Sequence, residues 1–136
     1  MKEKIKKIYS NAESASNSAL SAVRKYISLF RPDIFGKQKQ GNNAEENFFA
    51  MAEELKHASE IFFECAEECL LLENDTEDQE LHKKAVLLSE INDLCIEPFL
   101  KEVYEEALKP TVDVGKIKRS ADTLSVKLKN YMTRIF

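Results

Sequence analysis

The feature that most constrains the fold of this chain is a repeat of apolar and small residues at alternating steps of three and four. Residues at this spacing share one face of an α-helix, and such faces pack against one another at shallow crossing angles. Between residues 48 and 72 the repeat passes through Phe48, Met51, Leu55, Ala58, Phe62, Cys65, Cys69 and Leu72. Near the N-terminus it passes through Ile5, Tyr9, Ala12, Ser16, Ala19, Val23, Tyr26 and Phe30, and near the C-terminus through Val114, Ile117, Ala121, Leu124, Leu128, Tyr131 and Ile135. The pattern predicts long helices, each with a continuous buried stripe.

Further apolar residues lie beside these stripes and widen the face that each helix would bury. They are Ile8, Phe49, Ile61, Ala66 and Leu70. A wide apolar face favours a bundle of several helices over a two-stranded coiled coil. Glycine and proline, three of each among 136 residues, are too few for many short strands. We therefore predict a single all-α domain over residues 1–136, folded as an antiparallel, up-down-up-down four-helix bundle. Its helices are expected at about 2–30, 44–73, 77–108 and 113–135, with a polar linker at 31–43.

The third predicted helix, residues 77–108, carries an interrupted stripe. Leu81, Ala85, Leu88, Cys95 and Phe99 keep the spacing, but Asn92 breaks it and Pro98 follows shortly after. A proline inside a helix removes a backbone hydrogen bond and costs about 3 kcal/mol. We therefore expect this helix to be kinked or broken near Pro98. Accommodation of the curvature of the bundle is the simpler explanation, and a functional hinge is the alternative.

Two local features have both a structural and a functional explanation. Ala12, Ser16 and Ala19 are small residues at consecutive stripe positions, so that another helix can approach closely. Close packing within the chain is the expectation, and a groove for a partner helix is the alternative. In the linker, Ile34 and Phe35 are expected to cover the end of the bundle, with an exposed binding point as the alternative.

Net charge divides sharply along the chain. Residues 1–43 carry +6 and residues 110–136 carry +4, whereas residues 44–74 carry −8 and residues 75–109 carry −6. In an up-down-up-down bundle the first and fourth helices are neighbours, so the molecule would have a basic side and an acidic side. The simplest explanation is attraction between oppositely charged helices across their flanks. The functional explanation is the steering of a charged partner, or head-to-tail self-association.

These features predict a non-catalytic interaction protein, an adaptor or regulator, that binds a protein partner through a charged helix face. The candidate partner-binding residues are Lys116, Lys118, Arg119 and Lys127 on the basic side and Glu64, Glu67 and Glu68 on the acidic side. An alternative assigns the basic face of the first and fourth helices to an anionic membrane or to nucleic acid. Against nucleic acid, Tyr9, Tyr26 and Tyr131 fall on the buried stripes, where they cannot stack on bases. No small-molecule substrate is predicted.

A second alternative is a bundle that binds a metal or a small ligand, because two cysteines have the spacing C-x-x-x-C. His57 lies eight residues from Cys65, about 12 Å along a helix, which is too far for the two to share one ion. Antiparallel pairing across the turn near residue 75 places His82 level with Cys69 instead. The candidate ligands are therefore Cys65, Cys69 and His82, with Glu68 as a fourth. Cysteine also behaves as a small hydrophobic residue, and buried core thiols without metal or cofactor are the expectation.

Several catalytic classes lack the residues that they need. Glu54-x-x-His57 has the spacing of a di-iron ligand pair, but the second copy reads Gln79-x-x-His82 and the other two stripes carry no glutamate. The H-x-x-K-G pattern of phosphotransfer histidines is absent. Two histidines and three isolated glycines provide neither a nucleophile triad nor a phosphate-binding loop. We expect no enzymatic activity.

The cysteine count and the terminal sequence bear on the compartment. Three cysteines, an odd number without disulfide-like spacing, predict free thiols in a reducing environment. The basic start MKEKIKKIYSNAES is not followed by an apolar region, which argues against a secretory signal. Glu3 and Glu13 weaken its likeness to a mitochondrial presequence. The apolar runs, about four residues long, are far shorter than the roughly 20 residues of a membrane-spanning helix. We expect a cytoplasmic protein.

Overall fold

The computed structural model describes residues 2–30, 37–39, 44–76 and 79–136. Helix α1 spans Lys2–Ser28, α2 spans Ala44–Thr76, α3 spans Gln79–Ile91, the π-helical segment η1 spans Asn92–Ile96, α4 spans Glu97–Ala107 and α5 spans Val114–Ile135. Two short strands, β1 (Lys37–Lys39) and β2 (Thr111–Asp113), pair antiparallel and are the only strands among the described residues. The prediction of an all-α chain is confirmed. Ile34 and Phe35, for which two roles were expected, lie outside the described residues.

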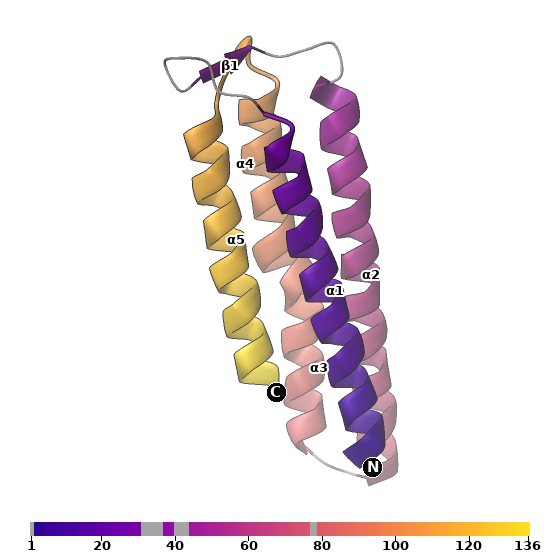
Figure 1. Cartoon of the computed structure of the whole chain (residues 1–136). Coiled ribbons are helices and arrows are strands. Elements are labelled where there is room, and N and C mark those ends of the chain that lie inside the picture. Colours follow the sequence, from indigo (N-terminus) through magenta and orange to yellow (C-terminus); the bar gives the residue numbers. More distant parts are fainter. Residues whose placement is uncertain (1, 31–36, 40–43, 77–78) are drawn as a thin grey trace.

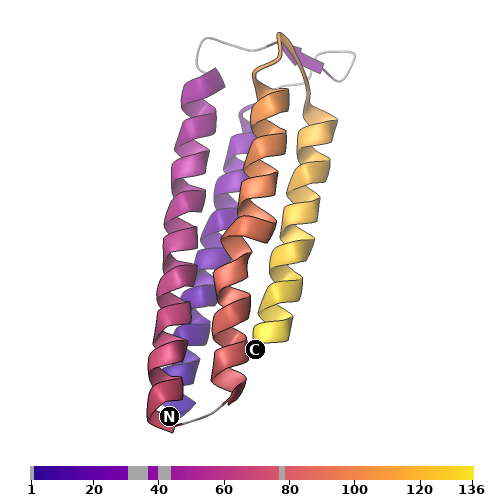
Figure 2. The same cartoon turned by 180° about the vertical axis from the view of Figure 1, so that it is seen from behind.

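The helices lie side by side along one long direction. Figure 1 shows α1 between α5 and α2, with the continuous arm of α3, η1 and α4 behind it, and Figure 2 shows this arm in front. Helix α1 contacts α2 and α5, α2 contacts α3, and α4 contacts α5. Helix α1, helix α2, the arm of α3, η1 and α4, and helix α5 run in alternating directions in both views. The two basic helices, α1 and α5, are therefore neighbours.

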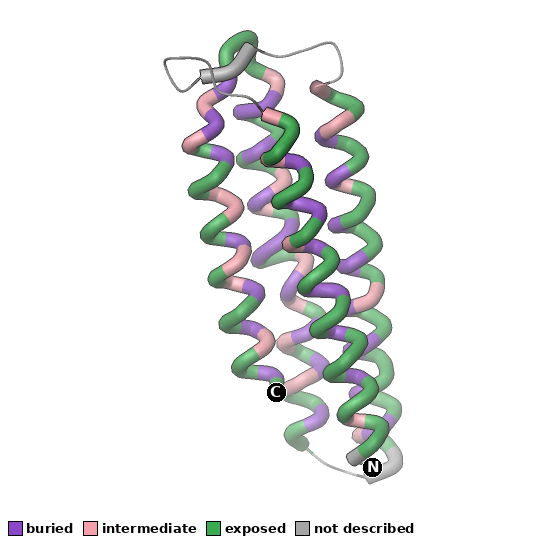
Figure 3. Tube along the Cα trace, viewed as in Figure 1, coloured by how far each residue is buried: buried purple, intermediate pink, exposed green. Residues whose placement is uncertain are grey.

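The predicted stripes form the core. All eight stripe positions of α2, from Phe48 to Leu72, are buried. The stripe of α5 is buried as well, apart from Ala121, which is half-buried. Figure 3 shows the buried positions on the sides where the helices face one another. Ala12 and Ala19 of α1 have no exposed surface, so these small residues are closely packed inside the chain.

Three side chains differ from the prediction made from the sequence. Tyr9, assigned to the stripe of the first helix, is 40% exposed, and Ile8 is buried in its place. Phe49 and Leu70, expected to widen the buried face of α2, are 51% and 41% exposed. A strict seven-residue repeat assumes about 3.5 residues per turn, whereas an α-helix has about 3.6, so the margin of a stripe drifts around the helix. Burial of residues at such a margin depends on the neighbouring helix, and the prediction for these three was wrong.

The third helical arm changes its helix type where the stripe is interrupted. The segment η1 begins at Asn92, whose carbonyl accepts a hydrogen bond from the Glu97 N–H five residues later. Pro98 follows in the first turn of α4, where a missing N–H is tolerated. The carbonyl four residues before Pro98 belongs to Leu94, and Lys127 Nζ of α5 donates to it at 3.3 Å. A lysine of another helix thus supplies a donor where the proline cannot.

The two strands join the connection after α1 to the connection before α5. Their register places Lys37 opposite Asp113. Val112 of β2 is fully buried, and the Asp113 side chain caps α5 by accepting a hydrogen bond from the Lys116 N–H at 3.2 Å. The sequence predicts only a polar linker here, because a three-residue strand is too short to show an alternating pattern.

Candidate functional site

One surface of α2 combines carboxylates with exposed apolar side chains. It comprises Phe63, Glu64, Glu67, Leu70 and Leu71, all of them exposed, and we call it the acidic–apolar surface. Exposed apolar clusters bordered by polar groups mark sites of association. The charge pattern of the sequence indicates Glu64 and Glu67. Leu70 was expected on the buried face, and Phe63 and Leu71 were not singled out because they directly adjoin stripe positions. Glu67 and Leu71 follow Phe63 by four and eight residues. This helical spacing places the three residues on one outward face of α2 and is the signal that could have identified the surface.

The hydrogen bond between Ser59 and Asn92 determines which neighbour the acidic–apolar surface borders. The Ser59 hydroxyl of α2 donates to Asn92 Oδ1 at 2.8 Å, so this flank of α2 faces the arm that contains η1. Phe63 and Leu70 follow Ser59 by four and eleven residues, which are about one and three helical turns. They therefore lie on the same flank, beside the α2/α3 contact.

The carboxylates of the acidic–apolar surface have no ion-pair partner among the described residues. The ion pairs found there join His57 to Glu60, His82 to Glu73, Lys83 to Glu80, and Lys109 and Lys116 to Glu106. Among these ion pairs, only the one between Lys116 and Glu106, at 3.8 Å, joins a basic helix, α5, to an acidic helix, α4. Direct ion pairs across helix flanks are therefore few in the described part of the chain. Glu64 and Glu67 are exposed carboxylates without such a pair.

The four basic candidates divide into two pairs. Lys116 lies beside Glu106, which is 4% exposed, and Lys127 donates to a backbone carbonyl of η1. Both side chains therefore take part in contacts within the fold. Lys118 and Arg119 are exposed, and neither has an ion pair within the described ranges. Lys118 and Arg119 are thus the basic candidates that can be altered without breaking an ion pair of the described residues.

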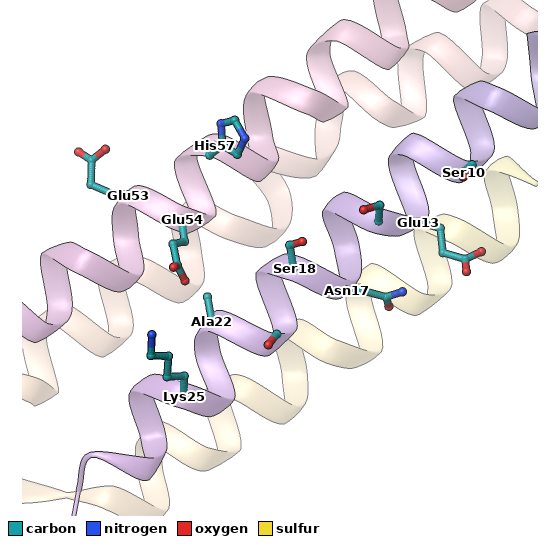
Figure 4. A pocket seen from close by; sticks show the side chains of 11 residues that line it. Ser10, Glu13, Asn17, Ser18, Ala22, Lys25, Glu53, Glu54 and His57 are labelled. Atoms are coloured by element: carbon teal, nitrogen blue, oxygen red, sulfur yellow. The ribbon is translucent and has the colours of Figure 1, made fainter.

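A polar groove runs between α1 and α2 (Figure 4). It has a volume of about 880 Å³, and its α1 wall carries Ser10, Ser14, Asn17, Ser18 and Ser21. Glu53, Glu54 and His57 line the α2 wall. Glu68, the third acidic candidate, follows His57 by eleven residues and therefore borders this α1 flank. His57 is exposed, as its position off the stripe predicts.

The structure does not bring the candidate metal ligands together. Cys65 and Cys69 are buried free thiols, and Cys65 Sγ lies 3.7 Å from the carbonyl oxygen of Ile8 as its hydrogen-bond donor. His82 is exposed, with its Nδ1 3.2 Å from Glu73 Oε2. Within the described ranges, no group of three or more histidine, cysteine or acidic residues is placed to hold a metal ion.

The thiols are held in their protonated form. Burial raises the pKa of Cys65 to about 12, with smaller contributions from nearby Glu68 and Glu64. Burial also raises the pKa of Cys69 and of Cys95. Because the thiolate is the reactive form, these three cysteines behave as core residues rather than as nucleophiles.

Comparison with known proteins adds no family. Neither a scan against protein-family models nor searches of curated proteins and of solved structures found a match. In the part of the chain that the structure describes, no helix is both long and apolar enough to cross a membrane.

Proposed function

We propose that this chain is a non-catalytic adaptor or regulator, an antiparallel four-helix bundle that binds a protein partner through the acidic–apolar surface of α2. The partner that this surface fits is a cationic amphipathic helix. The proposal is carried by one observation: Phe63, Leu70 and Leu71 are exposed beside carboxylates that have no ion pair among the described residues. Lysines of such a helix would pair with the carboxylates, and its apolar stripe would cover the apolar side chains.

The two components of the surface are expected to contribute differently. An exposed ion pair stabilises a complex by only about 0.2–1 kcal/mol, and salt screens it. Burial of apolar area stabilises by about 25 cal/mol per Å². Phe63, Leu70 and Leu71 should therefore supply most of the affinity. Glu64 and Glu67 should control the association rate and the choice of a basic partner.

The chemistry of the thiols supports a binding role over a catalytic one. Cysteine is the most nucleophilic side chain at neutral pH when it ionises, but all three thiols are buried and have raised pKa values. Reduced core thiols also suit a reducing compartment, and we place the protein in the cytoplasm on that basis.

Binding of a labelled synthetic helix built from leucine and lysine, followed by fluorescence anisotropy, tests the proposal. Wild-type protein should bind it more tightly at low salt. A Glu64→Lys/Glu67→Lys variant should lose about tenfold or more in affinity, which corresponds to about 1.4 kcal/mol. A Phe63→Ser/Leu70→Ser variant should lose affinity at both low and high salt, since its defect is apolar.

A comparison of opposite sign is Lys118→Glu/Arg119→Glu, which reverses two exposed charges on α5 and lowers the net charge, whereas the α2 variant raises it. It should bind the cationic helix at least as well as wild type. Circular dichroism melting of every variant checks that the fold is retained. Equal affinity of the wild type, the Glu64→Lys/Glu67→Lys variant and the Lys118→Glu/Arg119→Glu variant would refute the proposed binding surface.

A further inference from the structure

A groove between α1 and α5 combines basic and aromatic side chains. It has a volume of about 540 Å³ and is lined by Ile5, Lys6, Tyr9, Lys129, Met132 and Phe136, among others. The rings of Tyr9 and Phe136 are both exposed and meet edge to face, with centroids 4.7 Å apart. We call this hollow the basic–aromatic groove. It offers an apolar floor with ammonium groups at its edges.

Basic side chains continue along the same side of the molecule. A smaller hollow of about 140 Å³ between α1 and α5 is lined by Arg24 and Lys118. Lys6 and Arg24 are separated by eighteen residues, which is roughly 27 Å along α1. Among the described residues that line the two hollows, Asp122 is the one acid. Glu13 lies on the same face of α1 between Lys6 and Arg24, and its carboxylate raises the pKa of Tyr9. The α1/α5 side therefore carries basic residues over about five helical turns, with Glu13 and Asp122 among them.

The basic side chains that line the two hollows have no ion-pair partner among the described residues. Lys6, Arg24, Lys118 and Lys129 are exposed, and no ion pair involves them in the described part of the structure. Exposed, unpaired charges of one sign attract a partner surface of the other sign.

The acidic–apolar surface lies on the other side of the same molecule. Helix α1 faces the viewer in Figure 1, whereas α2 and α3 face the viewer in Figure 2. Phe63 and Leu70 lie on the flank of α2 that borders the third arm, and Val86 of α3 is exposed as well. The chain therefore carries, on opposite sides, an acidic helix with exposed apolar residues and a basic groove with an apolar floor.

We propose that the basic–aromatic groove binds the acidic–apolar surface of α2 of a second copy of this chain. Lys6 and Lys129 then face Glu64 and Glu67 of the neighbouring copy, and the Tyr9–Phe136 floor receives its apolar side chains. Because the two contacting surfaces differ, a pair of copies still has one free groove and one free surface, and the assembly extends head to tail. The inference rests on the proposed function, since it uses the same surface of α2.

Charge reversal tests this arrangement, with oligomeric size measured by sedimentation velocity at about 0.05 M and about 0.5 M salt, where screening lengths differ severalfold. Wild-type chains should associate with rising concentration at low salt and dissociate at high salt. A Lys6→Glu/Lys129→Glu variant and a Glu64→Lys/Glu67→Lys variant should each stay monomeric, because groove and surface then carry the same sign. Their equimolar mixture should associate again, and so should the chain that carries all four substitutions.

The matched control is Lys25→Glu/Lys101→Glu, which changes net charge as much as the groove variant but lies outside the groove. It should associate like wild type. A monomeric wild type, or equal loss of association in this control, overturns the proposal. If the wild type is monomeric and the groove variant alone loses binding to single-stranded DNA or to phosphatidylserine vesicles, the groove serves an anionic polymer or lipid instead.

The two proposals can fail separately. A wild type that stays monomeric yet binds the leucine–lysine helix through Glu64 and Glu67 overturns only the self-assembly. The other separate outcome is that the α2 variants bind that helix as tightly as wild type does, while association still depends on Lys6 and Lys129. This result overturns the cationic-helix partner and places the acidic counterpart of the groove elsewhere.

Discussion

The hydroxyl of Ser59 on α2 donates a 2.8 Å hydrogen bond to Oδ1 of Asn92, the residue at which α3 passes into η1. Ser59 is buried and Asn92 is half-buried. The bond ties α2 to the third arm at the point where that arm changes its helix type. A polar residue that interrupts the apolar stripe is thus explained by a polar contact across the helix–helix interface.

Replacing Asn92 with alanine is expected to lower the free energy of unfolding by about 1–3 kcal/mol, because the Ser59 hydroxyl stays buried without its acceptor. Adding Ser59→Ala should then cost less than it does in the wild type. Urea denaturation of the four proteins in this double-mutant cycle measures the coupling. Strictly additive effects would show that the hydrogen bond contributes nothing.

The contact between Lys127 and the Leu94 carbonyl gives a second prediction. Lys127→Met removes the donor but keeps most of the apolar stem, and it should lower the free energy of unfolding by about 0.5–1.5 kcal/mol. In a Pro98→Ala background the cost should shrink, because residue 98 then has its own N–H. Lys129→Met, two positions away on an exposed side chain, is the control and should be nearly neutral. If Lys127→Met lowers the free energy of unfolding equally in both backgrounds, the contribution of Lys127 does not depend on Pro98.

Replacement of Tyr26 with phenylalanine is expected to stabilise the folded protein. Its hydroxyl is buried and has no hydrogen-bond partner among the described residues, and burial raises its pKa to about 12. Tyr26→Phe keeps the edge-to-face contacts with Phe30 and Phe48 and should raise the free energy of unfolding by about 1 kcal/mol. Tyr26→Leu, the control, loses those ring contacts and should lower it. A lower melting temperature for Tyr26→Phe would reveal a partner of the hydroxyl in solution.

Stability should fall at alkaline pH. Burial raises the pKa of Cys65 from 9.0 to about 12 and that of Tyr26 from 10.0 to about 12. For each group, the pKa in the folded protein is higher than the pKa in the unfolded chain. The group's contribution to stability is therefore complete below the unfolded-state pKa and is lost as the pH rises toward the folded-state pKa. Each group then lowers the free energy of unfolding by up to about 1.4 kcal/mol per pH unit between its two pKa values.

Urea titrations at a series of pH values from about 8 to about 11 measure this slope, in a range where the unfolded thiol and phenol ionise. Cys65→Ala is less stable at neutral pH because it leaves a small cavity. Its stability should nevertheless fall less steeply above pH 9, because one ionising group has been removed from the unfolded state. A slope identical to that of the wild type would mean that Cys65 titrates normally in the folded protein.

The stripe of α2 was predictable from the sequence, because burial of each position from Phe48 to Leu72 follows from a periodicity that a single helix contains. The exposure of Tyr9 was not. The choice between Ile8 and Tyr9 at the margin of the α1 stripe depends on where α5 lies, and the ring of Phe136, which directly follows α5, contacts Tyr9. The candidate site was likewise half predictable, since charge appears in the sequence while the exposure of Phe63 and Leu70 does not.

Helix content, the buried stripes and the division of charge among segments were determined by the sequence alone, because each depends on residues within a few turns of one another. Only the tertiary structure decided that Lys116 and Lys127 serve internal contacts, whereas Lys118 and Arg119 form no ion pair with any described residue. It also decided that basic and aromatic side chains line one groove between α1 and α5. These outcomes depend on which flank of each helix meets a neighbour, and contacts between segments far apart in the chain set that orientation.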